Sequence, residues 1–213
     1  MKKLLSLILA LAMGVSATVA SACTSLYVGA DLTEDGTVIF ARSEDISNSY
    51  NKTMHVVESG AHKAGDVYTG CYGFTWTFTH DTYGFPCFSD DNGEAVGNEC
   101  PDCGQTHEHL PYGAAGTNEM GVSMSATETI GGCDAVSDAD PFTDEGIEEA
   151  EMIAVVLSEA ATAREGVALM ADIYSTVGAN GGSGLFIADA NEVWYMENVT
   201  GHQYIAVKLS STW

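Results

Sequence analysis

Apolar and polar positions along this chain alternate in short runs, and two longer stretches show helical spacing. A period of two residues is typical of half-buried strands, as where Phe74, Trp76 and Phe78 alternate with threonines. Runs of strand character occupy residues 24–28, 37–41, 54–58, 72–78, 121–127, 184–188, 193–197 and 204–209. The predicted order along the chain is several strands, a loop, a strand, two helices and further strands. This order predicts an α+β layered fold and not an alternating parallel one.

The first two predicted strands form a β-hairpin. Asp35 and Gly36 lie between them and supply a strong two-residue turn signal. Because a hairpin reverses the chain, the end of its second strand returns to the start of its first. The segment Arg42–Asp45 should therefore lie close to Cys23.

The two helical stretches span about residues 144–160 and 162–177. Thr162 and Glu165 open the second stretch with the spacing of a capping box, in which Thr caps the helix and Glu reaches back. Gly178 follows its last apolar position and is a plausible C-terminal cap.

The first residues have the pattern of a secretory signal. Lys2-Lys3 precede an apolar run, Leu4–Val15, and Ala20–Ala22 form a small-x-small cleavage site. Cleavage of residues 1–22 would leave Cys23 as the new N-terminus. Two alternatives remain open: a membrane anchor, and a lipoprotein acylated on Cys23. We expect a secreted or bacterial cell-envelope protein with no stable membrane insertion after cleavage.

The chain is strongly acidic. It has 7 Lys and Arg against 30 Asp and Glu, a formal net charge of −23. Such a surface repels phosphate backbones, so we expect no nucleic-acid partner. The hydrophobic content of 46% argues against disorder. Residues 23–213 are long enough for one domain with a substantial core.

Residues 81–113 predict a long Cys/His-rich loop. They contain three prolines and the Cys100-Pro101-Asp102-Cys103 motif, with His107 and His109 close behind. This set resembles half a zinc site, but its spacing is tight, and a disulfide or free thiols are the favoured interpretation. A redox CxxC motif is the weaker interpretation, because no helix pattern follows at once. The sequence leaves open the state of Cys71, Cys87, Cys100, Cys103 and Cys133.

Signal cleavage would change the chemistry of Cys23. An N-terminal cysteine carries a thiol and an α-amine on one residue, and that amine has a reference pKa of about 7.7–8.0. The amine can take the thiol proton, so nucleophile and base come from the same residue. Arg42 beside the thiol would favour the thiolate. Asp45 could accept a hydrogen bond from the α-amine; the alternative for Arg42 and Asp45 is a surface ion pair.

Several segments together resemble the secreted cysteine dipeptidases related to secernins (dipeptidase A type), which are N-terminal nucleophile hydrolases. These segments are residues 23–29, 42–45, 117–129, 162–166 and 189–204. Bile salt hydrolases and penicillin V acylases are more distant relatives that share the Cys and the Arg-x-x-Asp. The resemblance implies a four-layer αββα sandwich whose nucleophile begins a central strand.

The resemblance also bears on substrate choice. Amidases of the bile salt type have an Asn where the matching strand here reaches Glu128. A carboxylate suits a substrate with a free α-ammonium, as a dipeptide has, and would repel anionic bile-acid conjugates. The alternative for Glu128 is a solvated residue at a strand end.

The sequence departs from the family pattern near its C-terminal end. The side-chain oxyanion donor is commonly an Asn just beyond the segment matching Gly201–Tyr204, and none follows here before Trp213. Loss of one such donor typically costs about 10²–10³ in kcat. We therefore expect a domain that is incomplete at its C-terminus.

The function predicted from the sequence is hydrolysis of dipeptides through an acyl-enzyme on Cys23. A linear-amide acylase and a non-catalytic surface lipoprotein are the alternatives. No cofactor is expected, the expected partner is the dipeptide substrate, and a homo-oligomer is left open.

Overall fold

The computed structural model describes residues 23–45, 51–70, 73–91 and 113–213. The predicted signal peptide, Cys71 and the loop carrying Cys100, Cys103, His107 and His109 lie outside these described residues.

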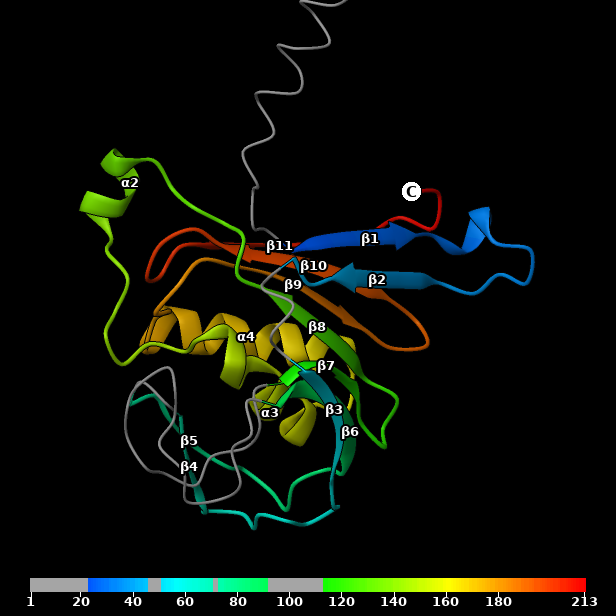
Figure 1. Cartoon of the computed structure of the whole chain (residues 1–213), viewed down its shortest axis with the longest axis horizontal. Helices are drawn as coiled ribbons and strands as arrows, with labels where there is room; N and C mark the ends of the chain where they lie inside the picture. The colour runs from blue at the N-terminus through cyan, green and yellow to red at the C-terminus, as the bar shows by residue number, and fades with distance from the viewer. Residues whose placement is uncertain (1–22, 46–50, 71–72, 92–112) are drawn as a thin grey trace, which may run out of the picture.

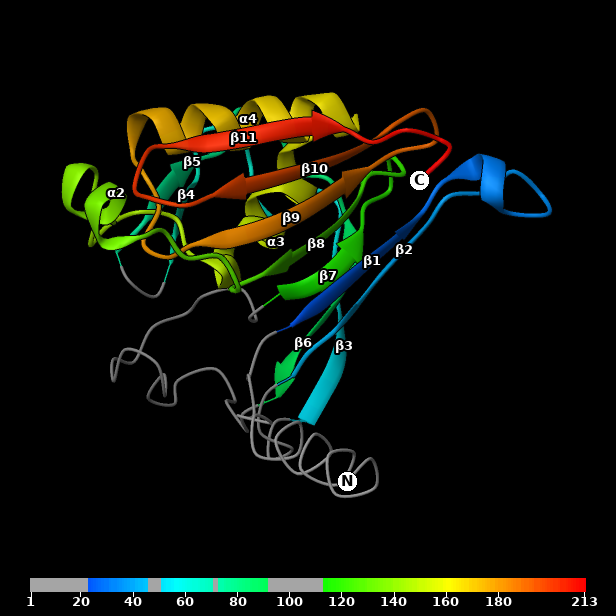
Figure 2. The ribbon, with the colours of Figure 1, turned by 90° about the horizontal axis from the view of Figure 1, so that it is seen from above.

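The described residues form three layers (Figures 1 and 2). The first is an antiparallel hairpin of β1 (Thr24–Val28) and β2 (Ile39–Ser43). The second is a seven-stranded sheet in the order β11-β10-β9-β8-β7-β6-β3. The third contains helices α3 (Glu149–Glu159) and α4 (Ala163–Thr176). These are three layers of the predicted αββα sandwich, and the α+β prediction is confirmed.

The remaining elements are short or belong to the large sheet. Its strands are β3 (Asn51–Val57), β6 (Phe85–Asp91), β7 (Gly113–Thr117), β8 (Ser123–Thr127), β9 (Ser183–Ala188), β10 (Val193–Asn198) and β11 (Tyr204–Lys208). A small hairpin is formed by β4 (Val67–Thr69) and β5 (Thr75–Thr77), and two short helices are η1 (Ala30–Leu32) and α2 (Asp134–Ala139). Every pairing between these strands is antiparallel.

Strand β9 lies at the centre of the packing, and all six of its residues are buried. Leu185 and Ile187 face the core under α3 and α4. Phe186 faces the hairpin layer, where its ring centre lies 5.7 Å from that of Phe40. Apart from Ser183 and Gly184 at its start, β9 is apolar, as is typical of a strand covered on both faces. It therefore packs against the hairpin on one face of the sheet and against the helices on the other.

Local hydrogen bonds and a glycine define where helix α4 begins and ends. The Thr162 hydroxyl accepts from the Glu165 amide at 3.2 Å, as the capping-box pattern predicts. The Glu165 carboxylate, however, accepts from the Ala161 amide at 2.8 Å. Gly178 ends α4 with a φ of 92°, a left-handed conformation that glycine adopts without strain.

The predicted loop over residues 81–113 is wrong for its first part. Residues 85–91 form β6, which pairs with β3 on one side and β7 on the other. Pro86 near its start removed the strand signal, but the pairing with β7 begins only at Cys87, so the missing N–H lies outside that ladder. Residues 92–112 lie outside the described part of the chain.

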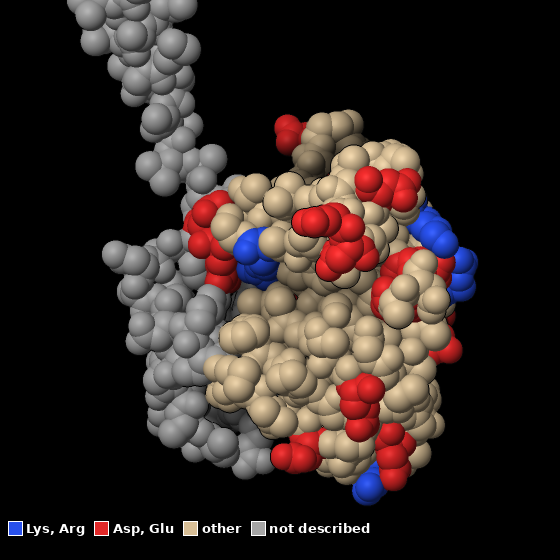
Figure 3. Space-filling view, turned by 90° about the vertical axis from the view of Figure 1, so that its right-hand side faces the viewer, with Lys and Arg blue, Asp and Glu red and all other residues tan. Residues whose placement is uncertain are grey.

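The charge predicted from the sequence is visible on the surface. Acidic side chains are spread over the face shown in Figure 3, with few basic ones among them. Within the residues that the structure describes, no helix is long and apolar enough to cross a membrane.

Candidate active site

The β1–β2 hairpin brings Arg42 to Cys23. Its register pairs Ser25 with Arg42, one residue pair away from the start of β1. The Arg42 Nη2 donates to the Cys23 Sγ, and these two atoms are 3.6 Å apart. The proximity predicted from the hairpin turn is therefore what the structure shows. A cation at this distance stabilises a thiolate more than a thiol.

Strand alternation turns Arg42 inward. Along β2, Phe40 and Arg42 are part-buried, whereas Ile39, Ala41 and Ser43 are exposed. Phe40 ends in the apolar contact with β9, and Arg42, two residues further, lies on the same face of the hairpin. The Arg42 side chain is only 7% exposed.

The other end of the guanidinium is firmly held. Arg42 Nη1 donates to the Ala114 carbonyl at 3.0 Å, to the Ala126 carbonyl and to Glu149 Oε1 at 3.1 Å. The register of β7 and β8 ends at the pair Ala115–Ser125, so Ala114 and Ala126 face each other one step beyond it. Arg42 therefore bridges the two carbonyls where this ladder ends.

Two carboxylates contact the Arg42 guanidinium. Glu44 Oε1 lies 3.3 Å from Nη2, and Glu149 Oε1 lies 3.1 Å from Nη1. Their side chains are 14% and 4% exposed. Cys23 and Glu44 therefore share the Nη2 end, while Glu149 is on the Nη1 end.

Asp45 lies beside the residue that follows Cys23. Its Oδ2 accepts from the Thr24 hydroxyl and from the Ser43 hydroxyl, both at 3.3 Å. These bonds place the Asp45 carboxylate at the open end of the hairpin, close to the backbone of Cys23. Its predicted role toward the α-amine stays a prediction.

Three glutamates at the start of α3 form a buried acidic cluster that the sequence analysis did not identify. Glu148, Glu149 and Glu151 are 9%, 3% and 1% exposed. The Glu148 carboxylate accepts from the Ala150 amide, and Glu151 Oε2 accepts from the Glu148 amide, so the two cap the helix reciprocally. Acidic residues are common in the first turn of a helix, so the sequence alone does not distinguish these glutamates from ordinary capping residues.

Burial raises the pKa of Glu148 from 4.5 to about 7. The charges of Glu128, Glu149 and Glu151 act in the same direction, and the hydrogen bond from the Ala150 amide opposes them. The region behind Arg42 therefore carries more carboxylates than Arg42 alone can neutralise.

Glu128 borders this region. It follows β8, two residues beyond Ala126, and its side chain is exposed. Its Oε1 would lie 3.3 Å from a Cβ placed on Gly181, so the carboxylate lies over the backbone just before β9. The charge of Glu128 contributes to the raised pKa of Glu148, so Glu128 belongs to the acidic surroundings of the start of α3.

The cysteines that the structure describes are unpaired. Cys23 is part-buried, Cys87 is buried and Cys133 is exposed. Burial raises the pKa of the Cys87 thiol, which leaves it poorly suited to nucleophilic chemistry. Among the described residues there is no group of three or more His, Cys, Asp or Glu that could hold a metal ion. The predicted zinc-like set of Cys100, Cys103, His107 and His109 falls outside them.

A family model for peptidase family C69 matches residues 22–212, nearly the whole chain. The chain belongs to peptidase family C69. This match begins one residue before Cys23 and includes Arg42, Asp45 and Glu128.

The family C69 chain is similar to curated dipeptidases. It is 36% identical over 192 residues to a protein named "Probable dipeptidase B" from Streptococcus pyogenes serotype M1, covering 90% of this chain and 36% of that protein. It is also 36% identical over 191 residues to a "Probable dipeptidase" from Salmonella dublin, covering 88% of this chain and 40% of that one. The chain thus spans well under half the length of these relatives.

A solved structure shares the fold of the family C69 chain. A mutant of conjugated bile acid hydrolase from Clostridium perfringens superimposes with a TM-score of 0.50 at 16% identity. The match covers 88% of this chain and 51% of the hydrolase. At this identity the likeness concerns the fold alone, and it supports the predicted sandwich.

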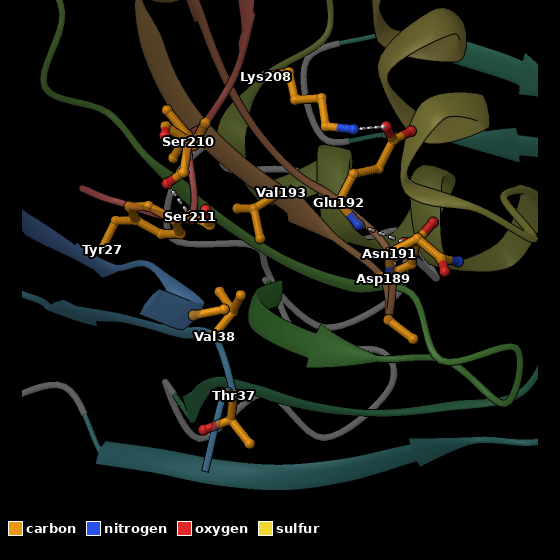
Figure 4. Close-up of a pocket in the computed structure, with 14 residues that line it drawn as sticks. Tyr27, Thr37, Val38, Asp189, Asn191, Glu192, Val193, Lys208, Ser210 and Ser211 are labelled. Carbon is orange, nitrogen blue, oxygen red and sulfur yellow. Dashed lines mark hydrogen bonds and ion pairs between the residues drawn. The ribbon is translucent and has the colours of Figure 1, made fainter. Parts of the chain in front are cut away.

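A separate cavity of about 720 Å³ lies at the far end of the hairpin in the family C69 chain (Figure 4). It is bounded by Tyr27 and Val38, by the β9–β10 turn and by the segment after β11, and Lys208 pairs with Glu192 on its wall at 2.9 Å. Cys23 is at the opposite end of β1, about 13 Å of extended strand away. The cavity is therefore distinct from the group formed by Cys23 and Arg42.

Proposed function

We propose that this protein is a cysteine dipeptidase whose mature form begins at Cys23. The observation that carries the proposal is the Arg42 guanidinium at 3.6 Å from the Cys23 Sγ, at the start of the first strand of a family C69 chain. The relatives named as dipeptidases support the choice of reaction.

The proposed chemistry has two halves. The α-amine of mature Cys23 takes the thiol proton, and the Sγ attacks the peptide carbonyl of the dipeptide. Collapse of the tetrahedral intermediate breaks the C–N bond, the proton passes to the leaving amine, and a thioester on Cys23 remains. Water then attacks the thioester with the α-amine again as base, which releases the first amino acid and restores the thiol.

Each neighbouring residue has a proposed role in this cycle. Arg42 stabilises the thiolate through Nη2. Asp45, held by Thr24 and Ser43, orients the α-amine. Backbone amides bind the oxyanion, and Glu128 binds the α-ammonium of the substrate.

The Cys23→Ala variant tests the reaction. We expect loss of dipeptide hydrolysis with an unchanged thermal unfolding curve, because Cys23 is only part-buried and precedes β1, whose pairing with β2 does not involve it. A panel of free dipeptides, penicillin V and conjugated bile acids, assayed with the natural protein, distinguishes the dipeptidase from a linear-amide acylase. Turnover retained in Cys23→Ala would refute the nucleophile; preference for the acylated substrates would refute the dipeptidase.

We further propose that the protein is exported and that cleavage after Ala22 activates it. The support is the pattern of residues 1–22 together with the position of Cys23 at the start of β1. The intact mass of the exported protein tests this. An unmodified chain beginning at Cys23 agrees with the proposal, whereas a diacylglyceryl adduct on that cysteine would identify a lipoprotein without a usable nucleophile.

A further inference from the structure

We propose that Glu149 is a positioning residue that holds the Arg42 guanidinium in the orientation that presents Nη2 to Cys23. This inference rests on the proposed role of Cys23 as the nucleophile. It concerns a residue that lies 107 positions from Arg42 in the sequence and touches it through a buried ion pair of 3.1 Å.

The donors of Arg42 divide into two groups. Each terminal nitrogen of a guanidinium has two N–H bonds in a rigid plane. Nη1 serves three acceptors, which are the carbonyls of Ala114 and Ala126 and the Glu149 carboxylate. Nη2 serves Cys23 and Glu44. Because the fork is planar, fixing Nη1 also fixes where Nη2 points.

Glu149 is well placed to fix this orientation. It is the first residue of α3, and the reciprocal cap between Glu148 and Glu151 holds the backbone on either side of it. Its side chain is 4% exposed, so little water competes for the ion pair. The two carbonyls belong to β7 and β8, whereas Glu149 approaches Arg42 from the helix layer and supplies the charged anchor on Nη1.

The position and the charge of the Glu149 carboxylate have opposite effects on the stability of the Cys23 thiolate. The anchor holds Arg42 against Sγ, which favours the thiolate. The negative charge of Glu149 offsets part of the Arg42 charge, which disfavours it. Two variants separate these effects. Glu149→Asp keeps the charge but withdraws the carboxylate by about 1.5 Å, one carbon–carbon bond, beyond hydrogen-bonding distance of Nη1. Glu149→Gln keeps an oxygen acceptor at the same reach and removes the charge.

The experiment measures alkylation of Cys23 by iodoacetamide across pH 5–9, about two units either side of neutrality, with peptide mass mapping to separate the thiols. Cys133 is exposed and provides a reference rate in every sample. In Glu149→Asp, the midpoint of the Cys23 profile should rise by about one pH unit, so that its rate on the acidic limb of the profile falls about tenfold relative to Cys133. In Glu149→Gln, the rate at pH 7 should equal or exceed that of the natural protein.

Glu159→Gln is the matched control. Glu159 ends the same helix, its side chain is 6% exposed, and its carboxylate accepts from the Thr79 amide at 2.9 Å. It is a comparable buried carboxylate about 15 Å along α3 from Glu149. A general loss of stability would therefore affect it equally, but the Cys23 profile should not change. Circular dichroism and thermal unfolding of all variants report folding.

The outcomes distinguish the two proposals. Slowed Cys23 alkylation in Glu149→Asp, without slowing in Glu149→Gln, supports the positioning role; any other pair of results overturns it. If Cys23 of the natural protein reacts no faster than Cys133, the nucleophile proposal itself fails. If Cys23 is faster but Glu149→Asp does not slow it, only the role of Glu149 fails.

Discussion

Arg42 belongs to the hairpin layer, yet its bonds reach the large sheet and the helix layer. The five partners that the structure shows for its guanidinium come from β7, β8, α3 and the end of its own hairpin. A lysine has one compact ammonium and cannot present two fixed ends in this way. The geometry explains why an arginine suits this position.

Glu128→Gln tests amine recognition at the residue scale. Glu128 is exposed in the free protein, and a bound dipeptide would desolvate its carboxylate. A charge-assisted hydrogen bond from the substrate ammonium in such a partly desolvated site contributes about 1.5–3 kcal/mol. We therefore expect the preference for a free dipeptide over its N-acetylated form to fall roughly ten- to a hundred-fold, measured as the ratio of kcat/KM values.

The control for Glu128 is Glu34→Gln, which removes the same charge from an exposed position in the turn of the first hairpin. It should keep the natural preference. If Glu128→Gln keeps it too, Glu128 is only a strand-end residue and another group selects the amine.

The site was predictable from the sequence where its contacts are local. Cys23 and Arg42 are 19 residues apart and joined by one hairpin, so the Asp35-Gly36 turn was enough to bring them together. Glu149 was not predictable in the same way. Its contact with Arg42 depends on how α3 packs against β7 and β8, and glutamates at a helix start have an ordinary explanation as caps.

Among the strands of the large sheet, β8 and β9 were predicted, whereas β6 and β7 were not. The first hairpin, with its Asp35-Gly36 turn, is confirmed, and so are the strands predicted over residues 184–188 and 193–197, which pair as β9 and β10. Strand β7 was missed because four of the five residues of Gly113–Thr117 are glycine or alanine, which have low strand propensity. Its small side chains are needed there: a Cβ on Gly116 would lie 2.7 Å from the Pro86 carbonyl and 2.8 Å from Leu157. Close packing against β6 and α3 selected these residues.

Helix α3 begins later than the spacing of apolar residues predicts, because Glu148 caps it. The sequence predicted a helix from about residue 144, but α3 begins at Glu149. Ile147 lies inside the stretch predicted as helix, but it is fully buried and pairs with Ala179 in a short parallel bridge. Glu148 then adopts extended backbone angles and caps the helix. Tertiary pairing of Ile147 thus sets where α3 begins, and so where Glu149 lies.

At the scale of the whole molecule, the raised pKa of Glu148 links folding to pH. The folded protein holds a proton on Glu148 up to about pH 7, whereas the unfolded chain releases it near 4.5. Below pH 4.5 this carboxyl is protonated in both the folded and the unfolded state, so it does not change the free energy of unfolding. As pH rises from there to 7, only the unfolded state releases the proton, and the free energy of unfolding falls. The full effect is on the order of 3 kcal/mol.

Glu148→Gln should remove this part of the pH dependence. The amide resembles the protonated carboxyl and can still accept from the Ala150 amide. Denaturant unfolding at pH 5 and pH 8 measures the difference in unfolding free energy between the two pH values. The decrease in the free energy of unfolding from pH 5 to pH 8 should be about 2–3 kcal/mol smaller in the variant than in the natural protein, because part of the full effect already lies below pH 5. Equal differences in the two proteins would show that Glu148 does not control this dependence.

The most direct test of Cys23 as an amine-activated nucleophile locates the acyl group. The chain beginning at Cys23 and a chain that retains Ala22 are each mixed briefly with an aminoacyl ester, quenched in acid and mapped by mass spectrometry. We expect an acyl group on Cys23 of the first chain, none on Cys87 or Cys133, and little on Cys23 when Ala22 blocks its amine. Acylation of Cys23 at the same rate in both chains, or acylation of exposed Cys133 at the rate of Cys23, would contradict this expectation.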